Sequence, residues 1–187
     1  MNKLHRWLCK SDYWRTTLAG EIMPWALKGI ELGDNVLEVG PGPGLTTDIL
    51  RPQVARMTSI EIDPRLAESL RQRLDGTNVT VVEGDATKMP FENASFTSAV
   101  SFTMLHHVPS SALQDRLIAE VFRVLRPGGT FAGTDSIWSR MFQLMHLFDT
   151  MIVVDPESFV ARLEAAGFVD VAVRRAERSF KFRAHHP

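Results

Sequence analysis

The fold of this chain is decided by residues 36–45, VLEVGPGPGL, where a short apolar run leads directly into a glycine-rich turn. Glycine has no Cβ, so it lets the backbone turn sharply and approach a ligand closely. The spacing is Gly-x-Gly-x-Gly, whereas dinucleotide-binding turns use Gly-x-Gly-x-x-Gly and triphosphate-binding loops end in Gly-Lys-Ser/Thr. The turn therefore predicts a ligand site at a strand-to-helix junction and argues against a nicotinamide oxidoreductase. A tight structural turn is the alternative.

Outward from this turn, short β-branched runs alternate with helical patterns. This alternation is typical of a parallel α/β sheet, and most of the runs are continuously apolar, as expected of strands that helices cover on both faces. The strands are expected at residues 35–39, 57–62, 79–82, 98–102, 130–133, 169–173 and 179–183.

The helices between these runs carry recognisable ends. Asp63 and Asp155 each precede a proline, which pairs a capping acid with a residue suited to the first helical position. Gly76 and Gly167 can close these two helices in left-handed turns. A third helix is expected over residues 111–125, ending before a Pro-Gly-Gly turn.

The segment ahead of the first strand, residues 11–30, is expected to form one or two helices. Pro24 is expected to kink or divide it, because proline cannot donate a helical hydrogen bond. An apolar stripe favours ordinary packing over a wall of a substrate site. Its members are Trp14, Leu18, Ile22 and Trp25.

Composition excludes several classes of protein. The 187 residues fit one domain, and 21 Lys plus Arg against 22 Asp plus Glu leave a formal charge of −1. That balance implies no bulk attraction to nucleic acid or to acidic membranes. The single cysteine, Cys9, excludes an intrachain disulfide and a Cys-rich zinc site. We find neither a signal-peptide core nor a membrane-spanning apolar stretch, so a cytoplasmic location is expected.

An acidic residue lies at the end of the second strand. Glu61 lies about 20 residues after the glycines, the position from which acids hold ribose hydroxyls in such folds. A carboxylate can accept hydrogen bonds from both hydroxyls of a diol. Asp63 is a rival for this role, but its place before Pro64 is better explained by capping.

After the third strand, residues 84–91 read GDATKMPF. Together with residues 38–44, Glu61 and the VLRPGG turn at 124–129, this motif resembles class I S-adenosylmethionine-dependent methyltransferases. More narrowly, it is similar to the broad group of small-molecule methyltransferases. The resemblance is good over residues 35–133 and looser to the end of the chain.

The resemblance implies the architecture and its division along the chain. It implies a Rossmann-like, doubly wound α/β fold with a seven-stranded, mostly parallel sheet whose last strand is antiparallel, after an N-terminal helical segment. One domain, 1–187, is expected. It comprises a helical cap (1–33), a cofactor-binding core (34–135) and an acceptor-side segment with the C-terminal helix and strands (136–187).

The resemblance also implies roles in binding S-adenosylmethionine, whose product would be S-adenosylhomocysteine. Glu38 would reach the methionine amino group, often through water, and Glu61 would hold the ribose. The turn would face the amino-acid part of the cofactor through Gly40, Pro41, Gly42 and Gly44. The adenine would contact Ile62, Asp85 and Ala86, and the sulfonium region would be lined by Ser101 and Phe102. Where relatives often have Phe-Asp, this chain has Phe96-Thr97, a turn position that leaves the cofactor site unaffected.

Catalysis needs alignment more than acid–base chemistry, because the methyl carbon is already activated. A general base is required only if the acceptor must lose a proton. His106, His107, His146 and Asp149 are the candidates, with Asp135 also considered. His146 and Asp149 lie in residues 136–154, a Met- and Phe-rich stretch that could cover the acceptor or serve as ordinary core. No metal site is expected, because His106 and His107 are sequence neighbours and no Glu or Cys supports them.

The acceptor is expected to be a small molecule, with no nucleic-acid or membrane partner. The alternatives are a protein or RNA methyltransferase and a non-catalytic relative that binds the cofactor. The basic tail at residues 174–183 is the one signal toward RNA, and an amphipathic edge strand explains it equally.

Overall fold

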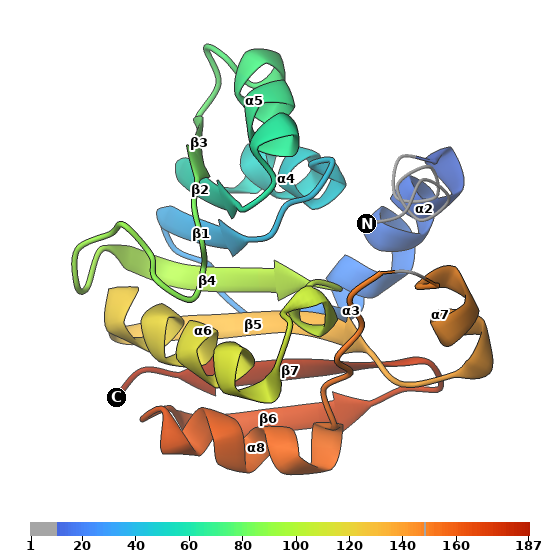
Figure 1. The fold of residues 1–187 in the computed structure, drawn as a ribbon. Coiled ribbons are helices and arrows are strands. Elements are labelled where there is room, and N and C mark those ends of the chain that lie inside the picture. The colour runs from blue at the N-terminus through green and yellow to red at the C-terminus, as the bar shows by residue number, and fades with distance from the viewer. Residues whose placement is uncertain (1–10, 148) are drawn as a thin grey trace.

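The computed structural model describes residues 11–147 and 149–187 and is built on one seven-stranded sheet (Figure 1). The strand order is β3-β2-β1-β4-β5-β7-β6. All strands from β3 to β5 pair in parallel, and β7 runs antiparallel to both of its neighbours. This confirms the expected fold class. The strands are β1 (Asn35–Val39), β2 (Arg56–Glu61), β3 (Val79–Glu83), β4 (Phe96–Phe102), β5 (Leu125–Ser136), β6 (Val169–Arg175) and β7 (Ser179–His185).

Helices cover both faces of the sheet. One face packs against α6 (Ser111–Val124) and α8 (Pro156–Ala165), which lie in front of the strands in Figure 1. The other packs against α2 (Asp12–Thr17), η1 (Leu18–Ile22), α3 (Met23–Ala26) and α4 (Leu45–Leu50). Adjacent residues of β1, Val36 and Leu37, belong to different clusters, because successive strand side chains alternate between faces. The remaining helices are η2 (Arg51–Gln53), α5 (Pro64–Arg73), η3 (Leu105–His107) and α7 (Arg140–Met145).

The capping predictions are confirmed. Asp63 accepts hydrogen bonds from two backbone amides of α5, and Asp155 does the same for α8. Gly76 and Gly167 follow with positive φ values of 72° and 108°. These ends are set by local hydrogen bonding, so residue type and spacing suffice to predict them.

The largest difference from the expected strand boundaries is in the fifth strand. The fifth strand begins at Leu125 rather than at residue 130, since Leu125 pairs with Phe96 before the chain bulges out and pairs again from Thr130 onward. The α7 helix ends at Met145. Residues three apart share a face only within a helix, so His146 and Asp149, which follow α7, do not share a helix face.

The N-terminal segment, as far as it is described, is one helical run that Pro24 does not divide, and the π-helical turn η1 ends two residues before Pro24. A wider turn accommodates a residue that has no amide proton to donate. Residues 1–10 of the expected cap lie outside the described residues. Within the described part of the chain, no helix has the length and apolar character needed to cross a bilayer.

Candidate functional site

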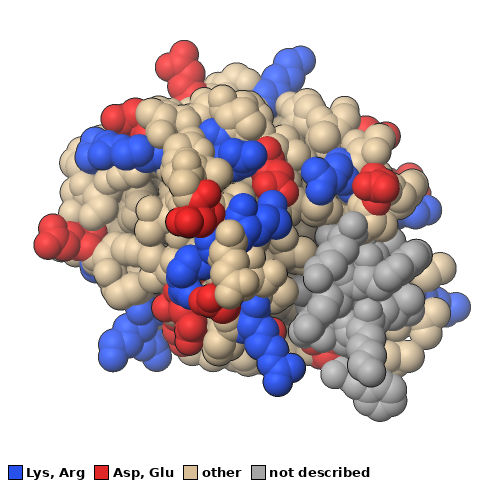
Figure 2. Space-filling model, turned by 90° about the horizontal axis from the view of Figure 1, so that it is seen from above, with Lys and Arg blue, Asp and Glu red and all other residues tan. Residues whose placement is uncertain are grey.

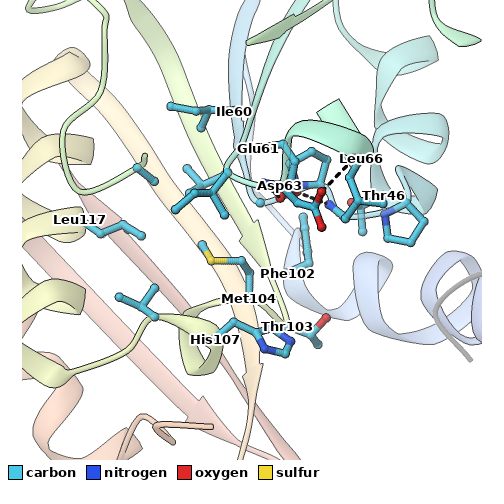
Figure 3. A pocket seen from close by; sticks show the side chains of 18 of the residues that line it. Thr46, Ile60, Glu61, Asp63, Leu66, Phe102, Thr103, Met104, His107 and Leu117 are labelled. Atoms are coloured by element: carbon cyan, nitrogen blue, oxygen red, sulfur yellow. Dashed lines mark hydrogen bonds between the residues drawn. The ribbon is translucent and has the colours of Figure 1, made fainter. Parts of the chain in front are cut away.

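A cavity of about 380 Å³ opens at the carboxyl ends of β1, β2, β3 and β4. The strand order reverses between β1 and β4, the position at which open α/β sheets bind ligands. Glu61, Asp63 and Thr46 lie together at one end of this cavity, with Met104 and His107 at the other (Figure 3).

The glycine-rich turn forms the floor of the first end. Gly40, Gly42 and Gly44 all have positive φ, at 68°, 55° and 87°. A Cβ on Gly40 would come within 2.2 Å of Cγ of Met104. Both the backbone conformation and the close packing therefore require glycine at this position.

Glu61 is held at the end of β2 by backbone amides. Its Oε2 accepts from the Gly42 amide at 2.9 Å, and its Oε1 accepts from the Asp63 amide at 3.0 Å. A carboxylate offers about four lone-pair sites, so each oxygen can accept one further bond. Asp63 caps α5, as predicted, and also lines the cavity.

The residues expected around an adenine lie beside Glu61. Ile62, Asp85 and Ala86 all line the cavity. The Ile62 side chain is 67% exposed, so its apolar surface is available to a ligand. Oδ1 of Asp85 accepts from the Thr87 amide at 2.8 Å, which fixes the loop after β3.

Glu38 lies behind the turn and does not line the cavity. Its carboxylate is buried and accepts hydrogen bonds from the hydroxyls of Thr46, Thr47 and Ser59. Burial raises the pKa of Glu38 above its ordinary value, and the three hydroxyl donors partly oppose this. Thr46 does line the cavity, so it stands between Glu38 and any ligand.

The two residues expected from β4 are separated by strand alternation. Phe102 lines the cavity, whereas Ser101 is buried elsewhere and does not line it. Thr103 follows with φ of +50°, a conformation that β-branched residues rarely adopt and that often marks functional sites. Its amide donates to the Thr134 carbonyl at 2.8 Å, which holds the turn in place.

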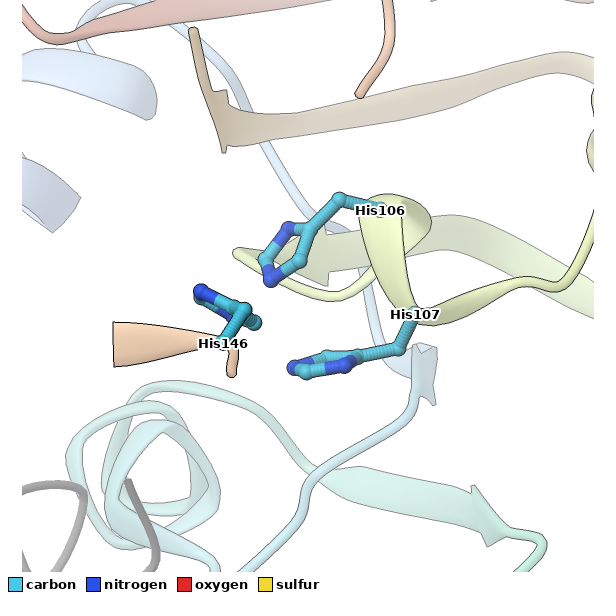
Figure 4. A group of neighbouring side chains, drawn as sticks. All are labelled: His106, His107 and His146. Carbon is cyan, nitrogen blue, oxygen red and sulfur yellow. The ribbon is translucent and has the colours of Figure 1, made fainter. Parts of the chain in front are cut away.

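The histidine candidates form one cluster at the second end. Ligand atoms of His106, His107 and His146 all lie within 4.8 Å of one another (Figure 4). Only His107 lines the cavity, since His106 and His146 are buried behind it. Asp149 lines the cavity as well.

Acceptors fix the orientation of two of these rings. Nδ1 of His106 lies 2.5 Å from Oδ1 of Asp135, and Nδ1 of His146 lies 2.8 Å from the carbonyl oxygen of Phe142. Desolvation is the main cause that lowers the pKa of His146, so the neutral ring is favoured. Nε2 of His106 is buried and has no hydrogen-bond partner among the described residues.

The Met- and Phe-rich stretch contributes little to the cavity. Among the described residues of the range 136–154, only Asp149 and Thr150 line it, while Met141 and Leu147 are exposed. The side chains of Met145 and Phe148 lie outside the described residues. The Ile152 amide donates to the His106 carbonyl at 2.8 Å and ties the end of this stretch to η3.

Several lining residues were not anticipated from the sequence. Trp14 and Leu18 line the cavity although their stripe favoured packing alone, and both also pack against the core. The others include Thr46, Thr103, Met104, Leu113, Leu117 and Thr150. For Thr103 and Met104 a signal existed, since both directly follow the carboxyl end of a strand.

The known proteins described below, which are similar to this chain, are named as methyltransferases. A family model described as "Methyltransferase domain" matches residues 37–133, slightly more than half of the 187 residues. The 2-methyl-6-phytyl-1,4-hydroquinone methyltransferase 2 of Oryza sativa subsp. japonica is 31% identical over 144 residues, 75% of this chain and 40% of the relative. A ribosomal RNA small subunit methyltransferase A of Thermococcus onnurineus is 48% identical over 58 residues, 31% of this chain and 21% of the relative.

A solved structure shares the fold. Haemonchus contortus phosphoethanolamine N-methyltransferase 2, in complex with phosphomonomethylethanolamine and S-adenosylhomocysteine, aligns with a TM-score of 0.78 at 16% identity. The alignment covers 98% of this chain and 56% of that chain. The matched part of this chain spans less than half the length of each of the two curated relatives in the preceding paragraph.

Proposed function

This chain belongs to the class I S-adenosylmethionine-dependent methyltransferases, and we propose that it transfers the cofactor's methyl group to a small, partly apolar acceptor. The observation that carries the proposal is one continuous cavity. It joins the glycine turn and Glu61 at one end to His107 and Asp149 at the other. Cofactor and acceptor must meet in such a space, because methyl transfer is an in-line displacement.

The cofactor is proposed to lie along the carboxyl ends of β1, β2 and β3. Glu61 already has its carboxylate aligned by two backbone amides, so it can accept both ribose hydroxyls without rearranging. Ile62 and Ala86 would sandwich or flank the adenine, and Asp85 would accept from its amino group. Glu38 would act through Thr46, which lines the cavity and whose hydroxyl donates to the Glu38 carboxylate.

The acceptor is proposed to occupy the end formed by Met104, His107 and Asp149. Phe102, Leu113 and Leu117 supply apolar surface there, which suits an acceptor with an apolar part. If the reacting hydroxyl or amine must lose a proton, His107 or Asp149 is placed to receive it. His146 lies behind this surface, so its part would be to position His107.

A small acceptor is favoured over RNA by the charge distribution. On the face drawn in Figure 2, Lys and Arg are interspersed with Asp and Glu rather than gathered in one patch. Ion pairs such as Arg73 with Asp48, at 2.7 Å, also bring opposite charges together. The curated hydroquinone relative is named for an acceptor that combines a polar ring with a phytyl chain, which is chemically consistent with this cavity.

The first test is calorimetry with S-adenosylhomocysteine on the parent, on Glu61→Ala and on Glu83→Ala. Glu83 pairs with Glu61 across β2 and β3 but is exposed and outside the cavity, so it is a matched control. Loss of one charge-assisted hydrogen bond costs about 1.5–3 kcal/mol, or roughly tenfold to a hundredfold in affinity. Equal affinities for all three proteins would refute the ribose role.

The second test is a screen of acceptors with methyl-labelled cofactor. Small phenols, hydroquinones and amines with apolar substituents are expected to be methylated with release of S-adenosylhomocysteine. Label found only in RNA or protein would replace the small-molecule proposal by a macromolecular one. Cofactor binding without transfer to any acceptor would point to a non-catalytic relative.

A further inference from the structure

The cluster of His106, His107 and His146 was not expected to bind a metal, because the sequence shows only an adjacent pair. The structure adds a third imidazole from a distant segment: His106 and His107 lie on η3, whereas His146 lies directly after α7 (Figure 4). From this geometry we infer a three-histidine site for a divalent transition-metal ion of the zinc type. Imidazole nitrogen is a preferred ligand of such ions.

Two of the rings are oriented as metal-bound histidines usually are. In such sites the second ring nitrogen donates to a carboxylate or a backbone carbonyl, which fixes the tautomer. Oδ1 of Asp135 accepts a hydrogen bond from Nδ1 of His106 at 2.5 Å. The Phe142 carbonyl oxygen accepts one from Nδ1 of His146 at 2.8 Å. Since both partners can only accept, the protons reside on Nδ1 in the neutral rings, and each Nε2 carries the lone pair a metal needs.

The state of His106 is difficult to explain without a ligand. Its Nε2 is fully buried and has no hydrogen-bond partner within the described residues. Buried polar atoms are nearly always satisfied, and exceptions call for an explanation such as an ion. An edge contact with Phe142, at a centroid distance of 4.9 Å, gives the ring an apolar neighbour and leaves Nε2 without a polar partner among the described residues.

Distances and charge are compatible with one ion. Zinc–nitrogen bonds of about 2.0–2.1 Å place tetrahedral ligand atoms roughly 3.3 Å apart. The ligand atoms of the three rings lie within 4.8 Å of one another, so the rings must approach by up to about 1.5 Å to reach this spacing. Two carboxylates, Asp135 and Asp149, act electrostatically on His146 and would offset the charge of an ion.

An ion held by three histidines retains an open coordination position. His107 lines the cavity, so the cavity provides the route by which the ion enters and by which a further ligand reaches it. The inference concerns binding of the ion and does not depend on the identity of the acceptor. It can fail while methyl transfer stands, and the reverse is also true.

The test uses the full chain without a histidine tag, stripped with a chelator and titrated with Zn²⁺ in calorimetry, then with Co²⁺ in visible absorption. We expect one ion per chain and the absorption bands of four-coordinate cobalt. Asp135→Asn should lower Zn²⁺ affinity by about 10–100-fold, the usual effect of losing an outer partner. His106→Ala, His107→Ala and His146→Ala should lower it further.

His186→Ala is the matched control, because His186 stacks on Phe122 and takes no part in the cluster. Binding of S-adenosylhomocysteine by each variant reports whether the fold is intact. His107 is less buried than its two neighbours, so His107→Ala remains informative if the others fail to fold. Zn²⁺ affinity that is unchanged in His107→Ala, or no binding by the parent, would overturn the inference.

Discussion

The two ends of the cavity are built in different ways. At the cofactor end, Glu61 and the Gly40–Gly44 turn come from the carboxyl ends of neighbouring parallel strands, and backbone amides satisfy the Glu61 carboxylate. At the acceptor end, the residues after α7 meet η3 through the histidine side chains and through the backbone bond from the Ile152 amide to the His106 carbonyl. Nε2 of His106 has no hydrogen-bond partner among the described residues. The cofactor end is formed by the ends of the sheet strands, whereas the acceptor end depends on how the connection after β5 packs against η3.

Because the Gly40–Gly44 turn belongs both to the sheet and to the cofactor end, we expect a substitution in it to lower both the free energy of unfolding and the affinity for S-adenosylhomocysteine. In Gly40→Ala, the left-handed backbone conformation costs about 1–2 kcal/mol, and the clash of the new Cβ with Met104 costs about 1–3 kcal/mol more. We expect the free energy of unfolding to fall by about 2–5 kcal/mol, with loss of S-adenosylhomocysteine binding. Urea unfolding and calorimetry measure the two effects. Gly76→Ala is the control. Gly76 also has a positive φ, but a Cβ there would meet no atom within 4 Å, so only the conformational cost of about 1–2 kcal/mol should remain.

At the acceptor end, stability and cofactor binding should separate. Asp135→Ala removes the acceptor of the His106 ring and amide, which should lower the free energy of unfolding by about 1–3 kcal/mol. Calorimetry should find an unchanged affinity for S-adenosylhomocysteine, because Asp135 does not line the cavity. Asp75→Ala, at an exposed carboxylate, is the control for both measurements. A large loss of cofactor affinity in Asp135→Ala would show that the two ends are one unit.

Glu38 gives the cofactor end a distinctive pH dependence. Burial raises its pKa in the folded state, so its contribution to stability is fully present below the unfolded-state pKa and is lost as the pH rises through the folded-state pKa. Glu38→Gln is neutral at every pH. The free energy of unfolding of Glu38→Gln, relative to the parent, should therefore increase as the pH rises above about 4.5. A pH-independent difference in urea titrations would contradict this.

The smallest effect is expected at Ile62, whose exposed side chain is proposed to await the adenine. Ile62→Ala should change the free energy of unfolding by no more than about 0.5 kcal/mol, as at most surface sites. Cofactor affinity should fall by a few-fold, because apolar contact is lost only in the complex. Leu144→Ala, at another exposed apolar side chain outside the cavity, should leave both quantities unchanged. A stability loss in Ile62→Ala without an affinity loss would assign Ile62 to the core.

The sequence by itself determined the features that depend on near neighbours in the chain. Caps such as Asp63 form hydrogen bonds two and three residues away, and continuously apolar runs become buried strands. Parallel strands bring their carboxyl ends to one edge, so placing Glu61 and Asp85 beside the glycine turn required only the order of strands and helices. For the same reason most strand boundaries were predicted to within one or two residues.

Only the tertiary structure decided the features made by distant segments. His146 joins His106 and His107 because the chain after α7 returns to η3, and no spacing in the sequence encodes that return. Ser101 faces away from the cavity because side chains alternate along β4, and Glu38 is covered because Thr46 and Thr47 turn toward it. Local rules fix hydrogen bonds and periodicity, whereas burial and side-chain convergence depend on the packing of the whole chain.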